Sequence, residues 1–167
     1  AGAPHAMDAP AWLGGVKASR LAGCSQSHVV LGYPIASMKD DQPAASVAAA
    51  LFGEGMSSPL MAEIRERRGL VYYAACSADV MEACGQFVIE ASTTPDKVDE
   101  LLRETHRLLQ EHAASVGALD LERARNQIAV RRVRAQERPV RRVEDAALDL
   151  FVHGRVRSPE ELRARVE

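Results

Sequence analysis

The chain has 167 residues, of which 47% are hydrophobic and 26% charged, and its formal net charge is -2 at pH 7. This balance is typical of a globular domain and excludes a wholly disordered chain, a collagen-like repeat and a disulfide-packed miniprotein. No apolar run approaches the roughly 20 residues of a membrane helix, and the near-neutral charge gives no reason to expect nucleic acid over the whole molecule. We therefore expect one hydrophobic core, with neither a membrane span nor a second full domain.

The first predicted elements follow a short lead-in. Residues 1–11 are rich in Ala, Gly and Pro without a period, so we expect a flexible segment. The β-branched, apolar run over residues 27–33 predicts a strand that ends at Pro34. Pro43 then opens an Ala-rich helix that ends at Gly53.

A second helix follows at once, and every local signal agrees on it. Ser58 is the expected N-cap, Pro59 lies at the first helical position and Gly69 ends the helix. Leu60 and Ile64 lie one turn apart and predict its apolar face.

Two strands are predicted over residues 70–80 and 84–92. The segment between them is too short for a crossover helix, so the strands should pair as an antiparallel hairpin. Along the second strand Glu90 and Ser92 alternate with apolar residues, which indicates that the two polar side chains share one face.

The remaining predicted elements are helices. Thr94 is the expected N-cap of a long helix, and further helices are predicted over residues 121–136 and 139–154. Ser158 caps a last helix, which we expect to be still under way at Glu167. This order of elements predicts an α+β fold in which helices cover one face of an antiparallel sheet.

The five histidines do not form a peptidase zinc motif. Neither H-E-x-x-H nor H-x-x-E-H occurs, and His106 and His112 lie six residues apart, on different faces of the long helix. The three cysteines form no C-x-x-C pair, so we interpret them as small buried thiols. We expect no metal in this chain.

An arginine-rich stretch suggests a nucleic-acid surface as a remote alternative. Eight arginines lie between Arg123 and Arg142, with Glu137 as the one acid. No aromatic residue is interleaved for base stacking, so we expect a solvated or partner-facing helix and no nucleic acid. If one helix continued through the region, a basic stripe would form from Arg131, Arg134, Arg138 and Arg141.

Arg65 and Tyr72 are the most specific pair of candidate site residues. Arg65 lies in the last helical turns, Gly69 allows a left-handed reversal, and Tyr72 falls early in the next strand. Both side chains are donors that could hold a peptide carbonyl or a developing oxyanion at one rim of the domain. A solvated arginine and a half-buried strand tyrosine fit the same spacing.

Residues 51–77 resemble the second domain of peptidase family M16, the pitrilysin and insulysin superfamily, in subunits akin to bacterial zinc proteases and mitochondrial processing peptidase. Residues 53–60 match a glycine-rich turn followed by two serines, and residues 65–72 match an Arg-Glu-Lys-Arg-Gly-Leu-Ala-Tyr run. Further parallels occur in the same order from about Trp12 onward: Gly-Gly-Val at Gly14, Gly-Gln-Phe at Gly85, and the segments that contain Glu122 and His153.

The resemblance implies the LuxS/MPP-like metallohydrolase fold, a two-layer sandwich of an antiparallel sheet with helices on one face. It implies that residues 12–167 form an inactive C-terminal M16 domain, truncated at both ends, which lacks activity alone. Zinc would be held by a partner domain or subunit, and two-domain subunits would pair as homo- or heterodimers.

The function implied is that of the non-zinc domain of a zinc metalloendopeptidase. Arg65 and Tyr72 would bind peptide substrate and assist the oxyanion, with Tyr73 as the alternative phenol. Pro59 stands where the family usually has Arg. A catalytically silent scaffolding subunit is the alternative function. The sequence leaves the compartment of a bacterial protein open between cytoplasm and periplasm.

Overall fold

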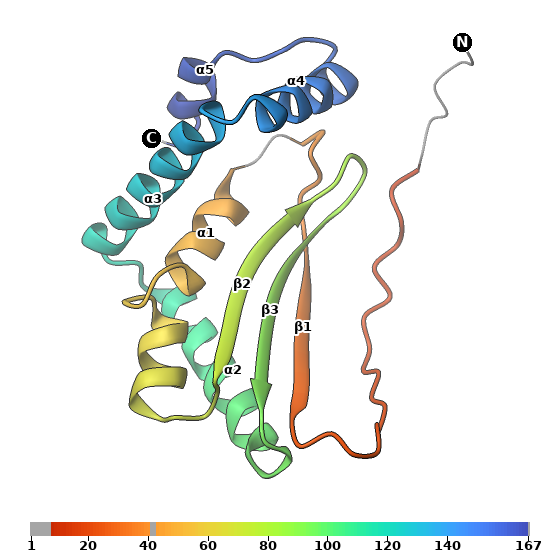
Figure 1. Ribbon diagram of the computed structural model, residues 1–167, viewed down its shortest axis with the longest axis vertical. Helices are drawn as coiled ribbons and strands as arrows, with labels where there is room; N and C mark the ends of the chain where they lie inside the picture. The colour runs from red at the N-terminus through yellow and green to blue at the C-terminus, as the bar shows by residue number, and fades with distance from the viewer. Residues whose placement is uncertain (1–7, 41–42, 167) are drawn as a thin grey trace.

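The structure is a computed structural model that describes residues 8–40 and 43–166 (Figure 1). Residues 8–26 form no helix or strand, and residues 1–7 of the predicted lead-in lie outside the described part. The elements that follow are β1 (Ser27–Ile35), α1 (Ala44–Gly53), η1 (Leu60–Arg67), β2 (Tyr73–Val80), β3 (Gly85–Thr93), η2 (Pro95–Lys97), α2 (Val98–Ala114), α3 (Ala118–Gln136), α4 (Pro139–His153) and α5 (Pro159–Ala164).

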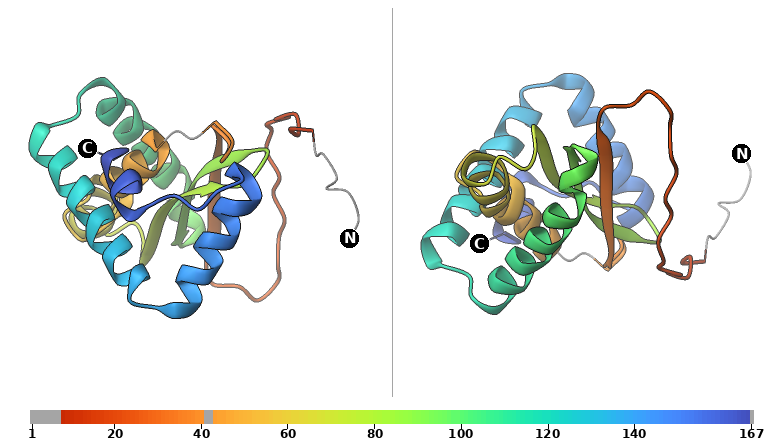
Figure 2. Two further views of the ribbon diagram at one scale, coloured as in Figure 1. Left: turned by 90° about the horizontal axis from the view of Figure 1, so that it is seen from above. Right: turned by 90° about the horizontal axis from the view of Figure 1, so that it is seen from below.

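The three strands form one antiparallel sheet in the order β1-β3-β2. On the central strand, Ala91 pairs with Val29 of β1 and with Ala74 of β2. Seen along the long axis, α1, η1 and α2 lie on one side of the sheet and the extended segment before β1 lies on the other (Figure 2). The predicted hairpin and the α+β fold with helices on one face are confirmed.

The main hydrophobic core fills the space between the sheet and these helices. Leu60 and Ile64 of η1 are both 0% exposed, which confirms the predicted apolar face. Each such burial removes a large aliphatic side chain from water and stabilises the fold by about 1.5–3 kcal/mol. The other buried members of this core are Phe52, Leu70, Val71, Ala74, Ile89, Ala91, Leu101 and Leu108.

A smaller core joins α3 to the far side of α1. Ala124 and Ile128 of α3 are buried against Ala50 and Leu51 of α1. Helix α3 therefore packs on a helix that itself covers the sheet, and the helical layer is two helices deep there.

The second predicted helix forms as a π-helix, η1. The Arg68 N–H donates to the Glu63 carbonyl, five residues back, at 3.1 Å. Ser58 is 0% exposed, and its hydroxyl accepts from the Met61 N–H at 3.4 Å, so the expected cap is a long hydrogen bond. Periodicity locates a helix but does not distinguish this wider winding, which is common near functional sites.

Several predicted boundaries are wrong by a few residues. β1 continues through Pro34 to Ile35, because an edge strand tolerates a proline whose missing N–H faces away from its neighbour. β2 begins at Tyr73 instead of residue 70. The last helix ends at Ala164, so it does not run on to the end of the chain as expected.

The caps of the later helices differ from one another. Ser158 forms the predicted cap: its hydroxyl accepts from the Glu161 N–H at 3.2 Å, and the Glu161 carboxylate accepts from the Ser158 N–H at 3.4 Å. Thr94 has the extended backbone of a cap, but its side chain makes no capping hydrogen bond to η2.

The arginine stripe does not lie on one helix. α3 ends at Gln136 and α4 begins at Pro139, so Arg138 lies between two helices. Arg131 pairs with Glu54 at 3.0 Å. The condition for the predicted stripe is therefore not met.

The prediction that the three cysteines are buried holds only in part. Cys24 is exposed, so the prediction of buried thiols is wrong for it, whereas Cys76 and Cys84 are half-buried. Burial raises the pKa of the Cys76 thiol to about 12.

Among the described helices, none combines the length and the apolar character that a membrane span needs.

We predict that Gly53→Ala destabilises the fold through the contact of α1 with β2. A Cβ atom at Gly53 would lie 2.2 Å from the Cys76 Cβ and 3.0 Å from the Cys76 backbone nitrogen. Since α1 or β2 must shift, the free energy of unfolding should fall by about 1–3 kcal/mol in urea titrations. Gly117→Ala is the matched control, because its new Cβ would meet only the movable carboxylate of Asp120. Equal effects of the two substitutions would contradict the close approach.

Candidate functional site

Arg65 lies on η1 with its charged group largely uncommitted. Its Nη1 is 3.6 Å from the Met56 Sδ, a weak acceptor, and its Nε is 3.7 Å from the Glu66 Oε1. The Arg65 side chain is 35% exposed, and both neighbours are exposed as well. The guanidinium can therefore bind an external acceptor without first breaking a strong ion pair.

The other charged side chains of η1 and its C-cap form ion pairs that hold this helix against α2. The carboxylate of Glu63, 14% exposed, pairs with Arg67 at 2.7 Å and with Arg68 at 3.1 Å. Arg68 also reaches Glu104 of α2 at 3.1 Å. The hydrogen bond from Arg107 lowers the pKa of Glu104, which favours the charged form of this carboxylate. η1 is thereby tied to α2.

Helix α3 holds the loop that leads into η1. Arg123 donates to the Ser57 hydroxyl at 2.6 Å, and Gln127 donates to the Glu54 carbonyl at 3.4 Å. Both residues come from the Glu122 segment of the family resemblance. Their contacts give that segment a structural role, because they fix the residues that precede Arg65.

Tyr72 is an exposed ring on a fixed backbone. Gly69 has a φ of +57°, the left-handed conformation that reverses the chain. The Thr93 hydroxyl donates to the Leu70 carbonyl at 2.6 Å, and Leu70 and Val71 are 4% and 6% exposed. Tyr72 follows with 82% of its surface exposed.

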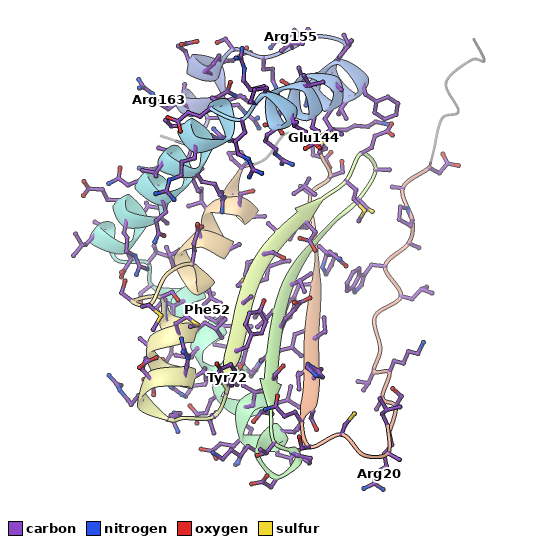
Figure 3. The ribbon with its side chains drawn as sticks, viewed as in Figure 1. Arg20, Phe52, Tyr72, Glu144, Arg155 and Arg163 are labelled. Carbon is purple, nitrogen blue, oxygen red and sulfur yellow. The ribbon has the colours of Figure 1, made fainter. Side chains whose placement is uncertain are left out.

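Arg65 and Tyr72 thus lie on one helix-turn-strand unit, at the end of the domain where η1 leads into β2. Figure 3 shows Tyr72 at the start of β2 beside η1. Tyr72 precedes the strand, and so the prediction that it falls within the strand is wrong. Within the described residues, no hydrogen bond joins the two side chains, so they are two separate donors.

Tyr73, the alternative phenol, belongs to a different surface. It is opposite Ser92 of β3, which is in turn opposite His28 of β1. These residues lie on the sheet face away from the helices, where a hollow of about 210 Å³ is lined by His28, Val29, Val30, Tyr73, Glu90, Ala91 and Ser92. The two consecutive tyrosines therefore lie on different surfaces.

This hollow was not predicted from the sequence. The alternation along β3 places Glu90 and Ser92 on one face, but the register that puts His28 next to Ser92 depends on pairing between distant strands. The Ser92 hydroxyl and the His28 Nδ1 are 2.8 Å apart. The alternation of residues along a strand shows which side chains share a face of the sheet. Their neighbours on the adjacent strands follow only from the register of strand pairing.

The described residues do not fit a zinc centre. Across residues 8–40 and 43–166, no group of three or more His, Cys, Asp or Glu side chains is placed to hold a metal ion. The candidate site residues are instead hydrogen-bond donors, Arg65 and Tyr72, and the separate hollow adds the exposed carboxylate of Glu90 and apolar side chains.

Comparisons with known proteins agree on one family. The family described as "Peptidase M16 inactive domain" matches residues 9–128. A protein of Rickettsia bellii named an uncharacterized zinc protease is 37% identical over 114 residues, 68% of this chain and 28% of the relative. The alpha subunit of the mitochondrial-processing peptidase of Caenorhabditis elegans is 30% identical over 155 residues, 84% of this chain and 30% of the relative.

Two solved structures share the fold. A crystal structure of a peptidase M16 inactive domain from Pseudomonas fluorescens is 26% identical, with a TM-score of 0.60 over 66% of this chain and 27% of that chain. A protease from Helicobacter pylori is 21% identical, with a TM-score of 0.73 over 87% of this chain and 36% of that one. The chain spans less than a third of the length of the two curated relatives, at 28% and 30%.

We predict that Thr93→Val loosens the turn that carries Tyr72. The substitution leaves the buried Leu70 carbonyl without its donor, which costs about 1–3 kcal/mol of unfolding free energy. Hydrogen exchange should also become faster over residues 69–72. Thr94→Val is the matched control, because Thr94 is exposed, and it should change stability by less than about 0.5 kcal/mol. Unchanged exchange in Thr93→Val would contradict the anchoring role.

Proposed function

The chain belongs to the family of peptidase M16 inactive domains, and on this premise we propose that it binds peptide substrate for a zinc-bearing M16 partner. The partner is a second domain of the same protein or a separate subunit of a dimer. The observation that supports this most is the pair Arg65 and Tyr72: two accessible donors on a backbone that η1, α2 and β3 hold in place.

Arg65 would bind a carbonyl of the peptide. Its guanidinium has several N–H donors in a planar fork, and it faces a thioether and one distant carboxylate instead of a close ion pair. A bound carbonyl would therefore add hydrogen bonds without costing Arg65 an existing strong one.

Tyr72 would donate its phenol hydrogen to the oxygen of the peptide bond under attack. A fixed donor aimed at that oxygen stabilises the charge that develops there, which lowers the barrier to hydrolysis. A zinc ion on the partner would supply the activated water. The part of this chain that acts is the phenol, and its backbone is set by Gly69 and Thr93.

We predict that Arg65→Ala and Tyr72→Phe each lower peptide turnover by the complete protein. Removal of one oxyanion donor typically reduces kcat by about 10²–10³, and we expect an effect of this order for Tyr72→Phe. The measurement is steady-state cleavage of a fluorogenic peptide by the protein together with its zinc-bearing partner.

Two variants serve as matched controls for that experiment. Arg67→Ala removes an arginine of the same helix whose side chain is 77% exposed, and Tyr73→Phe removes the neighbouring phenol. Both should retain nearly full turnover. If Arg65→Ala and Tyr72→Phe retained it too, the proposal would fail in favour of a catalytically silent scaffold. A loss confined to Tyr73→Phe would assign the role to the other tyrosine.

The proposal also predicts the metal content of this chain. Purified alone, it should hold no stoichiometric zinc and cleave no peptide, because the zinc belongs to the partner. Elemental analysis after dialysis measures this directly. One tightly bound zinc per chain would place the metal on this domain instead of on its partner, and would overturn the proposal that this is the non-zinc domain.

A further inference from the structure

The face of the sheet opposite the helices carries one carboxylate without a counter-ion. Glu90 projects from the central strand, and the residues that pair with it are Val30 of β1 and Ala75 of β2. Neither can neutralise its charge. Within the described residues Glu90 takes part in no ion pair.

The ion pairs of the described residues involve twelve acidic side chains: Glu54, Glu63, Glu66, Glu82, Glu100, Glu104, Glu111, Asp120, Glu144, Asp145, Asp149 and Glu161. Glu90 is not among them.

The hollow beside Glu90 has an apolar wall and a polar floor. Val30 and Tyr73 are 64% and 51% exposed and flank it from the two outer strands. Ser92 is 8% exposed, and its hydroxyl already bonds to the His28 Nδ1 at 2.8 Å. The free charge of the hollow is therefore the carboxylate of Glu90, next to an aromatic ring and an aliphatic side chain.

The Trp12 indole lies over the sheet face next to the hollow. A Cβ atom at Gly32, two positions after Val30 on the same face, would lie 3.4 Å from the Trp12 indole. The indole thus covers β1 next to Val30. At the opposite end the hollow is lined by Tyr73, whose backbone directly follows that of Tyr72.

We propose that this hollow is a subsite for a lysine or arginine side chain of the bound peptide. The inference rests on the proposed function, because the ligand is the same peptide that Arg65 and Tyr72 would hold. The aliphatic stem of such a residue would pack on Val30 and on the Tyr73 ring. Its cationic end would bind the Glu90 carboxylate, with the ring face as a further favourable contact.

A peptide set that separates charge from shape tests the subsite. A fluorescent alanine-rich peptide carries one lysine, which is moved through every position, and each member has a partner with norleucine, which keeps the stem without the charge. Binding to the 167-residue chain is measured by fluorescence anisotropy. We expect one position at which lysine binds about tenfold more tightly than norleucine, as for one charge-assisted hydrogen bond.

Three variants identify the group responsible. Glu90→Gln should abolish the preference for lysine, and Glu90→Lys should replace it with a preference for glutamate. Asp79→Asn is the matched control, because Asp79 lies on the same sheet face about 13 Å along the strand from Ala75, and it should keep the preference.

The outcomes distinguish this subsite from the proposed function. Arg65→Ala should weaken all peptides alike and leave the ratio of lysine to norleucine unchanged. If peptides bind without any lysine preference, or if the preference survives Glu90→Gln, the subsite is overturned while peptide binding stands. If no peptide binds at all, both proposals fail.

Discussion

The hydrogen bond from Thr93 to the Leu70 carbonyl joins the end of the central strand to the turn between η1 and β2. Without it, a buried carbonyl would lack a partner at the point where the chain reverses through the left-handed Gly69. Lys97 supports the same turn by donating to the Gly69 carbonyl at 3.1 Å. The placement of Arg65 before the turn and of Tyr72 after it depends on these contacts.

The charges on η1 differ in what they do. Arg67 and Arg68 both pair with Glu63, and Arg68 continues to α2 through Glu104. Arg65 has no comparably close carboxylate, since its distance to Glu66 is 3.7 Å. Because ion pairs in solvent contribute little stability, the network acts mainly by fixing the direction of η1. The guanidinium of Arg65 keeps N–H donors that can bind another group.

Local signals in the sequence predicted most elements, whereas contacts between distant segments decided what could not be predicted. Gly69 and the capping box at Ser158 were recognisable because their causes lie within a few residues. The π-helical winding of η1 and the late start of β2 leave no distinct mark in the apolar pattern from which the two elements were predicted. The spacing around Gly69 singled out Arg65 and Tyr72, and the family resemblance supplied their expected role, whereas the pairing of His28 with Ser92 arises only from strand register.

The alternation of a strand separates the roles of the two consecutive tyrosines. Ala74 is buried on the helical face, so Tyr73 must point to the open face, where it meets Ser92 and the hollow. Tyr72 precedes the strand and is free of this alternation, which allows its ring to extend from the turn at 82% exposure. A peptide that crossed this end of the sheet would meet the Tyr72 donor first and the Glu90 carboxylate next. Its backbone would then be recognised at the turn before β2, and one of its side chains by Glu90 of the neighbouring strand β3.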